Sequence, residues 1–174
     1  MENKKIQMNK TALVTGGASG LGYELALLLA KDTHNLVLVD IDAKKLQEAK
    51  QEIETKFSVQ VQVLDKDLSK ANISEEIMLD LNNTPIDVLV NNAGFGLFGS
   101  IEETSLPDAR NQFEVNLFGP ARIIQLVISY MRKQKFGKII NVGSVAGKIY
   151  TILGGWYHAT NMLLKDGVIA LESN

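Results

Sequence analysis

The sequence contains no cysteine among its 174 residues, which excludes a disulfide framework, a thiolate metal site and a cysteine nucleophile. The two histidines, His34 and His158, lie far apart in the sequence and form no cluster of metal ligands. No apolar run approaches the length of a membrane span, and the polar residues 1–10 do not resemble a signal peptide. We therefore expect a cytoplasmic protein without a metal site.

A large excess of charge of either sign is missing as well. The 18 Lys and Arg residues and 20 Asp and Glu residues give a formal net charge of −2. The lysines form no basic stripe, so we expect no nucleic-acid partner and no membrane partner. The composition, 45% hydrophobic and 22% charged, is ordinary for a globular protein. The length is that of one domain, which we expect to span residues 1–174.

Glycine is concentrated near the start of the chain, in the stretch TGGASGLG at residues 15–22. A short apolar run precedes it and leucines at helical spacing follow it, which predicts a strand, a tight turn and a helix. Such a junction directs the free N–H groups of the first helical turn at a phosphate. Gly16 would make the sharp turn, Gly20 would let phosphates approach, and Gly22 would let helix and strand pack closely. A glycine loop that closes an ordinary turn is the alternative.

Strand and helix patterns alternate along the whole chain. Strands are expected at residues 11–14, 36–39, 59–64, 86–90 and 138–142, and helices at residues 21–30, 43–56, 73–81, 105–134 and about 157–172. The long helix is opened by Ser105 with Asp108 three residues later, which is the spacing of a capping box. This alternation predicts a three-layer αβα fold with a Rossmann-type, doubly wound parallel sheet, and ligands at the carboxyl ends of its strands.

Asp40 follows the second expected strand, eighteen residues after Gly22. In a dinucleotide fold, a carboxylate at this place accepts hydrogen bonds from the adenosine ribose and repels a 2′-phosphate. The glycine loop contains no Arg or Lys, and none directly follows Asp40. Both observations favour NAD over NADP. The alternative is an aspartate that only caps a turn or a helix.

Three polar residues of the second half suit carbonyl chemistry. Ser144 closes a strand and Tyr157 opens a helix, so both hydroxyls can lie at one carboxyl-end crevice. There they could hold a carbonyl oxygen, and one could supply a proton as hydride reaches the carbon. Pro120 lies four residues after Asn116 and has no N–H, which frees the carbonyl of Asn116 for water and kinks the helix. A turn serine, a core tyrosine and a tolerated kink are the alternatives.

In combination, these motifs resemble the short-chain dehydrogenase/reductase family. After the glycine stretch come, in order and at the spacings of the family, Asp67-Leu68, Asn91-Asn92-Ala93-Gly94, Asn116, Gly143-Ser144 and Tyr157. The resemblance covers essentially the whole chain. It implies an NAD(P)-dependent oxidoreductase that interconverts an alcohol and a carbonyl by hydride transfer. The substrate would be a small alcohol or ketone, and a homo-oligomer is compatible with the resemblance.

The resemblance also implies functions for single residues. Asp67 and Leu68 would flank the adenine ring, and Tyr157 would be the proton donor and acceptor while Ser144 holds the substrate carbonyl. The carbonyl of Asn116 would hold a water in a proton relay. The expected cofactor-binding residues are Gly16, Ser19, Gly20, Leu21, Gly22, Asp40, Asp67, Leu68, Asn92, Ala93 and Gly94.

One departure from the family pattern lies in the catalytic set itself. The family has a lysine four residues after the tyrosine, and this chain has Asn161 at that catalytic position. A phenol with an ordinary pKa of about 10 is a poor acid–base catalyst near neutral pH. Asn161 can donate a hydrogen bond to the nicotinamide ribose, but it brings no charge.

A second departure concerns the end of the chain. The family's sheet continues with two further strands, whereas this sequence ends at Asn174. We therefore expect a domain that is incomplete at its C-terminus and lacks the last two strands of the family. Its fifth strand would be an open edge, and open edges invite association. A catalytically impaired nucleotide-binding relative, or a nonfunctional truncated product, is the alternative to an active enzyme.

Overall fold

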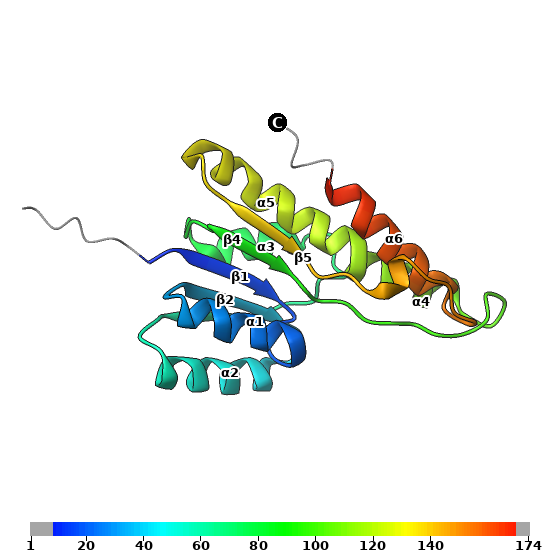
Figure 1. The fold of residues 1–174 in the computed structure, drawn as a ribbon, viewed down its shortest axis with the longest axis horizontal. Helices are drawn as coiled ribbons and strands as arrows, with labels where there is room; N and C mark the ends of the chain where they lie inside the picture. Colours follow the sequence, from blue (N-terminus) through cyan, green and yellow to red (C-terminus); the bar gives the residue numbers. More distant parts are fainter. Residues whose placement is uncertain (1–8, 170–174) are drawn as a thin grey trace, which may run out of the picture.

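The computed structural model describes residues 9–169, with side chains described through Leu164. Its parallel strands form one sheet in the order β3-β2-β1-β4-β5 (Figure 1). Because the order reverses between β1 and β4, the chain leaves their carboxyl ends in opposite directions and a crevice opens there. The strands are β1 Thr11–Thr15, β2 Asn35–Asp40, β3 Val61–Asp65, β4 Val88–Asn91 and β5 Lys138–Asn141.

Helical segments connect the strands, as parallel pairing requires. Two of the expected helices, over residues 43–56 and 73–81, are confirmed with the same bounds. The expected last helix ends outside the described residues. The segments are α1 Gly20–Lys31, α2 Ala43–Lys56, α3 Ile73–Leu81, α4 Leu106–Phe113, a π-helical turn Glu114–Phe118, α5 Gly119–Gln134, a 3-10 turn Val145–Gly147 and α6 Gly155–Ile169.

The sheet has an apolar core on each face. Successive side chains of a strand point to opposite faces, so Leu13 packs in one core with residues of α3 and α5. Its neighbours Ala12 and Val14 pack in the other core with residues of α1 and α2. Figure 1 shows α1 and α2 on one side of the sheet and α5 on the other. The predicted three-layer, doubly wound α/β fold is therefore confirmed.

Helix α1 meets the sheet through its small residues. Gly22, Ala26 and Ala30 are its buried residues, whereas Leu28 is 62% exposed and Leu21 57% exposed. Small side chains at a spacing of four let the helix axis come close to the strands. The leucines consequently lie at the sides and on the outside of the helix, although their spacing was the pattern that predicted this helix.

The long helix expected over residues 105–134 is divided into two by a π-helical turn. Ser105 does cap its start, because its Oγ accepts from the N–H of Asp108 at 3.2 Å. The π turn Glu114–Phe118 then precedes α5, in whose first turn Pro120 lies. Proline is well tolerated in a first helical turn, where its missing N–H would lack an intrahelical partner anyway. Where the sequence predicted a kink, the structure thus has a π-helical turn, which contains one residue more than an α-helical turn.

Strand β5 forms one edge of the sheet in the described part of the chain. Its residues alternate between exposed and half-buried, and the side chain of Ile140 is 44% exposed. The N–H of Lys138 and that of Val142 donate to β4 and its flanking residue. Alternate N–H groups point to opposite edges, so those of Ile139 and Asn141 face the open side.

Candidate active site

The glycine loop adopts a conformation that only glycine adopts readily. Gly16 and Gly20 have φ angles of +64° and +56°, in the left-handed region. A Cβ at Gly22 would overlap the carbonyl oxygen of Gly16 and the side chain of Asn92. At Gly20, no described atom lies within 4 Å of an added Cβ. The backbone of Gly20 is therefore open to a ligand, while Gly22 keeps α1 tight against the loop.

Side-chain hydrogen bonds join the loop to the end of β4. The buried Oγ1 of Thr15 accepts from the N–H of Asn92 at 3.0 Å and from that of Ala93 at 3.1 Å. In return, Nδ2 of Asn92 donates to the carbonyls of Thr15 and Gly16, each at 3.2 Å. These bonds fix the two strand ends that border the crevice. Sequence reasoning missed Thr15, whose signal is its place as the last residue before the glycine loop.

Asp40 holds the far side of the glycine loop. Its Oδ2 accepts from the N–H of Ala18 at 3.1 Å, and its Oδ1 accepts from the N–H groups of Ile41 at 2.8 Å and Asp42 at 3.2 Å. The carboxylate thus caps its own turn, as the alternative interpretation proposed. It also lines a cavity, together with Gly16 and Ser19, and the contact to a ribose stays a prediction.

This first cavity has a volume of about 450 Å³ and lies over the carboxyl ends of the central strands. It brings together most of the residues expected to bind the adenosine half of a cofactor. Gly20, Leu21 and Gly22 are not among its lining residues, and Leu21 is exposed on α1. The lining residues are Gly16, Ser19, Val39, Asp40, Ile41, Lys66, Asp67, Leu68, Ser69, Asn92, Ala93, Gly94, Phe95, Asn111 and Val115.

Lys66 adds a cation to this cavity that sequence reasoning did not consider. Its Nζ lies 2.9 Å from Oδ2 of Asp80 and 3.3 Å from Oε2 of Glu76, both in α3. The hydrogen bond with Asp80 is the main reason why the pKa of Lys66 is raised. The ammonium group is therefore already paired with two carboxylates.

A second cavity, of about 140 Å³, contains three of the four expected catalytic residues. Asn116, Tyr157 and Asn161 line it, and Ser144 does not. It shares the segment 92–95 with the first cavity. The chain that leaves β4 therefore borders both cavities. The lining residues are Asn92, Ala93, Gly94, Phe95, Asn116, Val142, Gly143, Tyr157, Thr160, Asn161 and Leu164.

The side chain of Asn116 is bound to the backbone of Phe95. Its Oδ1 accepts from the N–H of Phe95 at 3.0 Å, and its Nδ2 donates to the carbonyl of Phe95 at 2.8 Å. Nε2 of the buried Gln112, one turn earlier, donates to the same carbonyl at 3.2 Å. The π turn thus holds the segment that both cavities share. Gln112 is a further residue that sequence reasoning missed.

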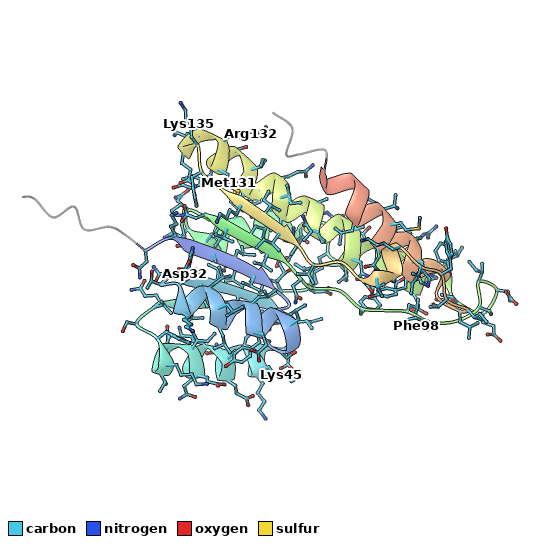
Figure 2. All side chains as sticks on the ribbon, in the orientation of Figure 1. Asp32, Lys45, Phe98, Met131, Arg132 and Lys135 are labelled. Carbon is cyan, nitrogen blue, oxygen red and sulfur yellow. The ribbon has the colours of Figure 1, made fainter. Side chains whose placement is uncertain are left out.

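Tyr157 lies in the first turn of α6, with its ring at one wall of the smaller cavity. The centroid of its ring is 5.5 Å from that of Phe98, in a tilted arrangement. Figure 2 shows Phe98 on the loop that follows β4, at the opposite end of the molecule from Lys135. An exposed aromatic residue thus packs beside the ring of Tyr157.

Ser144 and Asn161 are connected to each other. Oγ of Ser144 accepts from the N–H of Ala146 at 3.2 Å and caps the 3-10 turn. Oδ1 of Asn161 accepts from the N–H of Ser144 at 3.0 Å, and its Nδ2 donates to the carbonyl of Tyr157 at 2.9 Å. Both ends of this amide are bonded to protein backbone. The hydrogen bond from Asn161 to a ribose, which the sequence suggested, stays a prediction.

A sequence profile described as short chain dehydrogenase matches residues 10–172. The chain belongs to this family. A diacetyl reductase ((S)-acetoin forming) of Staphylococcus epidermidis is 39% identical over 163 residues, which cover 91% of this chain and 63% of the relative. A probable short-chain type dehydrogenase/reductase of Helicobacter pylori is 29% identical, with coverages of 88% and 55%. The structure of L-sorbose reductase from Gluconobacter frateurii, complexed with NADPH and L-sorbose, is similar with a TM-score of 0.89 at 26% identity, with coverages of 94% and 63%.

This short-chain dehydrogenase chain spans between 55% and 63% of the length of these three relatives. The match confirms an oxidoreductase family with a Rossmann-type nucleotide-binding fold. None of the helices in the described part of the chain combines the length and the apolar character that a membrane crossing requires. Among the side chains described, those of residues 9–164, no three acidic or histidine groups lie close enough to hold a metal ion.

Proposed function

We propose that this short-chain dehydrogenase binds NAD(H) across the two cavities and transfers hydride between the cofactor and a small alcohol or ketone. The observation that carries the proposal is the shared segment 92–95, because it lines both the cavity of Asp40 and the cavity of Tyr157. The residues fit a dinucleotide. The glycine loop has left-handed glycines and open space at Gly20, which is a cradle for phosphate.

Each half of the site has its own task. Asp40, Asp67 and Leu68 line the larger cavity and would hold the adenosine half. The bound nicotinamide supplies the hydride. Tyr157 would give its phenol proton to the carbonyl oxygen of the substrate, and the hydroxyl of Ser144 would hold that oxygen. Asn116 keeps the segment between the two halves in place through Phe95.

The preference for NAD over NADP is supported by two charges in the larger cavity. The carboxylate of Asp40 would repel a 2′-phosphate and accept from a free 2′-hydroxyl. Lys66, which lines the same cavity, is paired with Asp80 and Glu76. A 2′-phosphate would have to compete with both carboxylates for that ammonium group.

A second candidate function is nucleotide binding with little or no turnover. It is favoured by the lining of the smaller cavity, where no Lys or Arg is found among the residues described. A cation near a phenol lowers its pKa, and without one the phenol is a poor acid–base group at neutral pH. Asn161 takes the place where such a charge is expected from the family resemblance.

Single-turnover oxidation of NADH separates the two functions. The probe substrate is diacetyl (butane-2,3-dione), because a relative is a diacetyl reductase. We expect NADH to bind and to be oxidised slowly. The rate should be about 10²- to 10⁴-fold below that of an enzyme with matched acid–base catalysis. Tyr157→Phe should bind NADH equally well and abolish the oxidation. Equal rates in both proteins would contradict the function of Tyr157, and a failure to bind NADH would contradict the whole proposal.

A further inference from the structure

The loop between β5 and α6 is attached to α6 by the side chain of Asn161. This side chain is 8% exposed. Its oxygen accepts from the N–H of Ser144 at 3.0 Å, and its nitrogen donates to the carbonyl of Tyr157 at 2.9 Å. One amide therefore joins the backbones of two residues that are thirteen positions apart in the sequence.

The direction of this amide determines what it can bind. Its oxygen and its nitrogen both already have backbone partners at hydrogen-bond distance. Without Asn161, the N–H of Ser144 would lose its acceptor, and such a loss is costly. The carbonyl of Tyr157 also accepts from Oγ1 of Thr160 at 2.9 Å. The second hydrogen of Nδ2 and the second lone pair of Oδ1 belong to a residue that is only 8% exposed, so little of the amide is open to a ribose. The geometry thus favours a connection within the protein over a contact to a ligand.

Ser144 gains a defined position from this connection. Its N–H is held by Asn161, and its Oγ accepts from the N–H of Ala146. The hydroxyl hydrogen has no acceptor among the described residues, so it is free to be donated. Gly147 lets the loop lie close to the helix, since its added Cβ would be 3.1 Å from the backbone oxygen of Asn161.

A second side chain of α6 holds a different part of the same loop. The ring of His158 is buried, with Nδ1 2.7 Å from the carbonyl of Ala146. Its Nε2 accepts from the N–H of Thr151 at 3.0 Å. His158 thus holds residues 146–151 while Asn161 holds Ser144, and the two attachments can be removed separately.

We propose that Asn161 is a positioning residue that sets Ser144 relative to Tyr157 and does not bind the cofactor. The inference rests on the proposed function only in giving Ser144 and Tyr157 a catalytic purpose. The attachment itself can be measured without cofactor or substrate. A failure of the attachment and a failure of the proposed function are therefore distinguishable.

The first measurement is amide hydrogen exchange at Ser144 by NMR, without cofactor. In the unmodified chain, we expect this N–H to be protected. Asn161→Ala should accelerate its exchange by about tenfold, the effect of losing one net hydrogen bond. Met162→Ala, on an exposed position of the same helix, should not. His158→Phe should accelerate exchange at Thr151 and leave Ser144 protected.

A spectroscopic signature distinguishes positioning from a general loss of structure. Asn161→Asp keeps an acceptor for the N–H of Ser144, so this proton's chemical shift should follow the titration of the introduced carboxyl. Equal exchange at Ser144 in the unmodified chain and in Asn161→Ala would overturn the proposal. If Asn161→Ala does not fold, an unprotected Ser144 amide in the unmodified chain would overturn it.

The second measurement addresses the cofactor. Adding NADH to the unmodified chain should shift the backbone amide of Gly20 strongly and the side-chain NH₂ resonances of Asn161 only slightly. The dissociation constant of NADH in Asn161→Ala should stay within about threefold of the original, since no contact to the cofactor is lost. A loss of more than about tenfold, with exchange at Ser144 unchanged, would make Asn161 a ribose ligand and overturn the proposal.

Discussion

Three asparagine side chains shape the site by binding backbone groups. Asn92 binds the glycine loop, Asn116 binds Phe95, and Asn161 binds Ser144 together with the carbonyl of Tyr157. An amide carries a donor and an acceptor on one short, stiff side chain, so each of these residues can fix two backbone groups at once. The geometry of the crevice therefore depends on three uncharged residues. Replacing one of them by another uncharged residue removes hydrogen bonds to the backbone and leaves the charge of the site unchanged.

Replacing Asp40 by alanine tests the cofactor preference. The carboxylate should accept from a ribose 2′-hydroxyl and repel a 2′-phosphate, so the advantage of NADH over NADPH should narrow by about 1–3 kcal/mol. Both affinities should also fall, because Ala18 loses its acceptor. Titrations followed by nicotinamide fluorescence measure both constants. Asp42→Ala, which removes the cap of α2 and an ion pair with Lys45, should leave the preference unchanged. Equal affinities of the unmodified chain for the two cofactors would refute this prediction.

Two glycine substitutions should differ in their effect on stability. A Cβ at Gly22 would meet the Gly16 carbonyl, so Gly22→Ala should lower the free energy of unfolding by about 1–3 kcal/mol through overpacking. At Gly143 no described atom lies within 4 Å of an added Cβ, and Gly143→Ala should change stability by less than about 0.5 kcal/mol. Urea unfolding measures both. Similar losses in the two variants would show that the tight contact at Gly22 has no energetic weight.

At the scale of residues, the sequence predicts those features that depend on local chemistry. The turn at Gly16 and the carboxylate at the end of β2 follow from neighbours in the chain. The use of Asn161 could not be predicted, since its partner Ser144 belongs to a different segment. The same holds for Lys66, whose charge is paired by residues of α3. Whether a polar side chain faces a ligand or a backbone is decided by packing.

Among the elements, the helices with continuous patterns were predicted most accurately. The segment 105–134 was predicted as one helix, but it contains the π turn Glu114–Phe118. A π turn inserts one residue without altering composition, so helical periodicity hardly reveals it. Pro120 signalled a disturbance at the right place. It could not specify whether the helix bends or widens.

Strand β5 should make the chain self-associate through its open edge. In the dilute monomer we expect fast amide exchange at Ile139 and Asn141, whose N–H groups face away from β4, and slow exchange at Ile140; association should slow exchange at the first two. Ile140→Lys should reduce association in light scattering, because a charge on an edge strand opposes pairing. The control variant Leu79→Lys removes an apolar side chain that is 75% exposed on α3, and it should not reduce association. A monomeric unmodified chain with protection along the whole strand would refute this prediction.

At the scale of the whole molecule, the larger cavity should dominate cofactor binding. It offers about 450 Å³ against about 140 Å³ at the catalytic end, and the smaller cavity has no Lys or Arg among its described lining residues. ADP-ribose should therefore bind within about threefold of NADH, a difference below about 1 kcal/mol. Competition between the two in a fluorescence titration measures this. If NADH binds more than about tenfold tighter, the nicotinamide half is held firmly and the prediction fails.

The hydrogen bonds between Thr15 and Asn92 have a consequence for the kinetics of binding. The glycine loop is anchored to β4 before any nucleotide arrives, so a ligand finds its phosphate cradle already assembled. Little backbone entropy is then lost on association, and the ordering term that weakens many loop-based sites is small. Encounter, rather than rearrangement of the loop, should limit how fast the nucleotide associates. In this chain the loop is thus held by its own hydrogen bonds before a nucleotide binds.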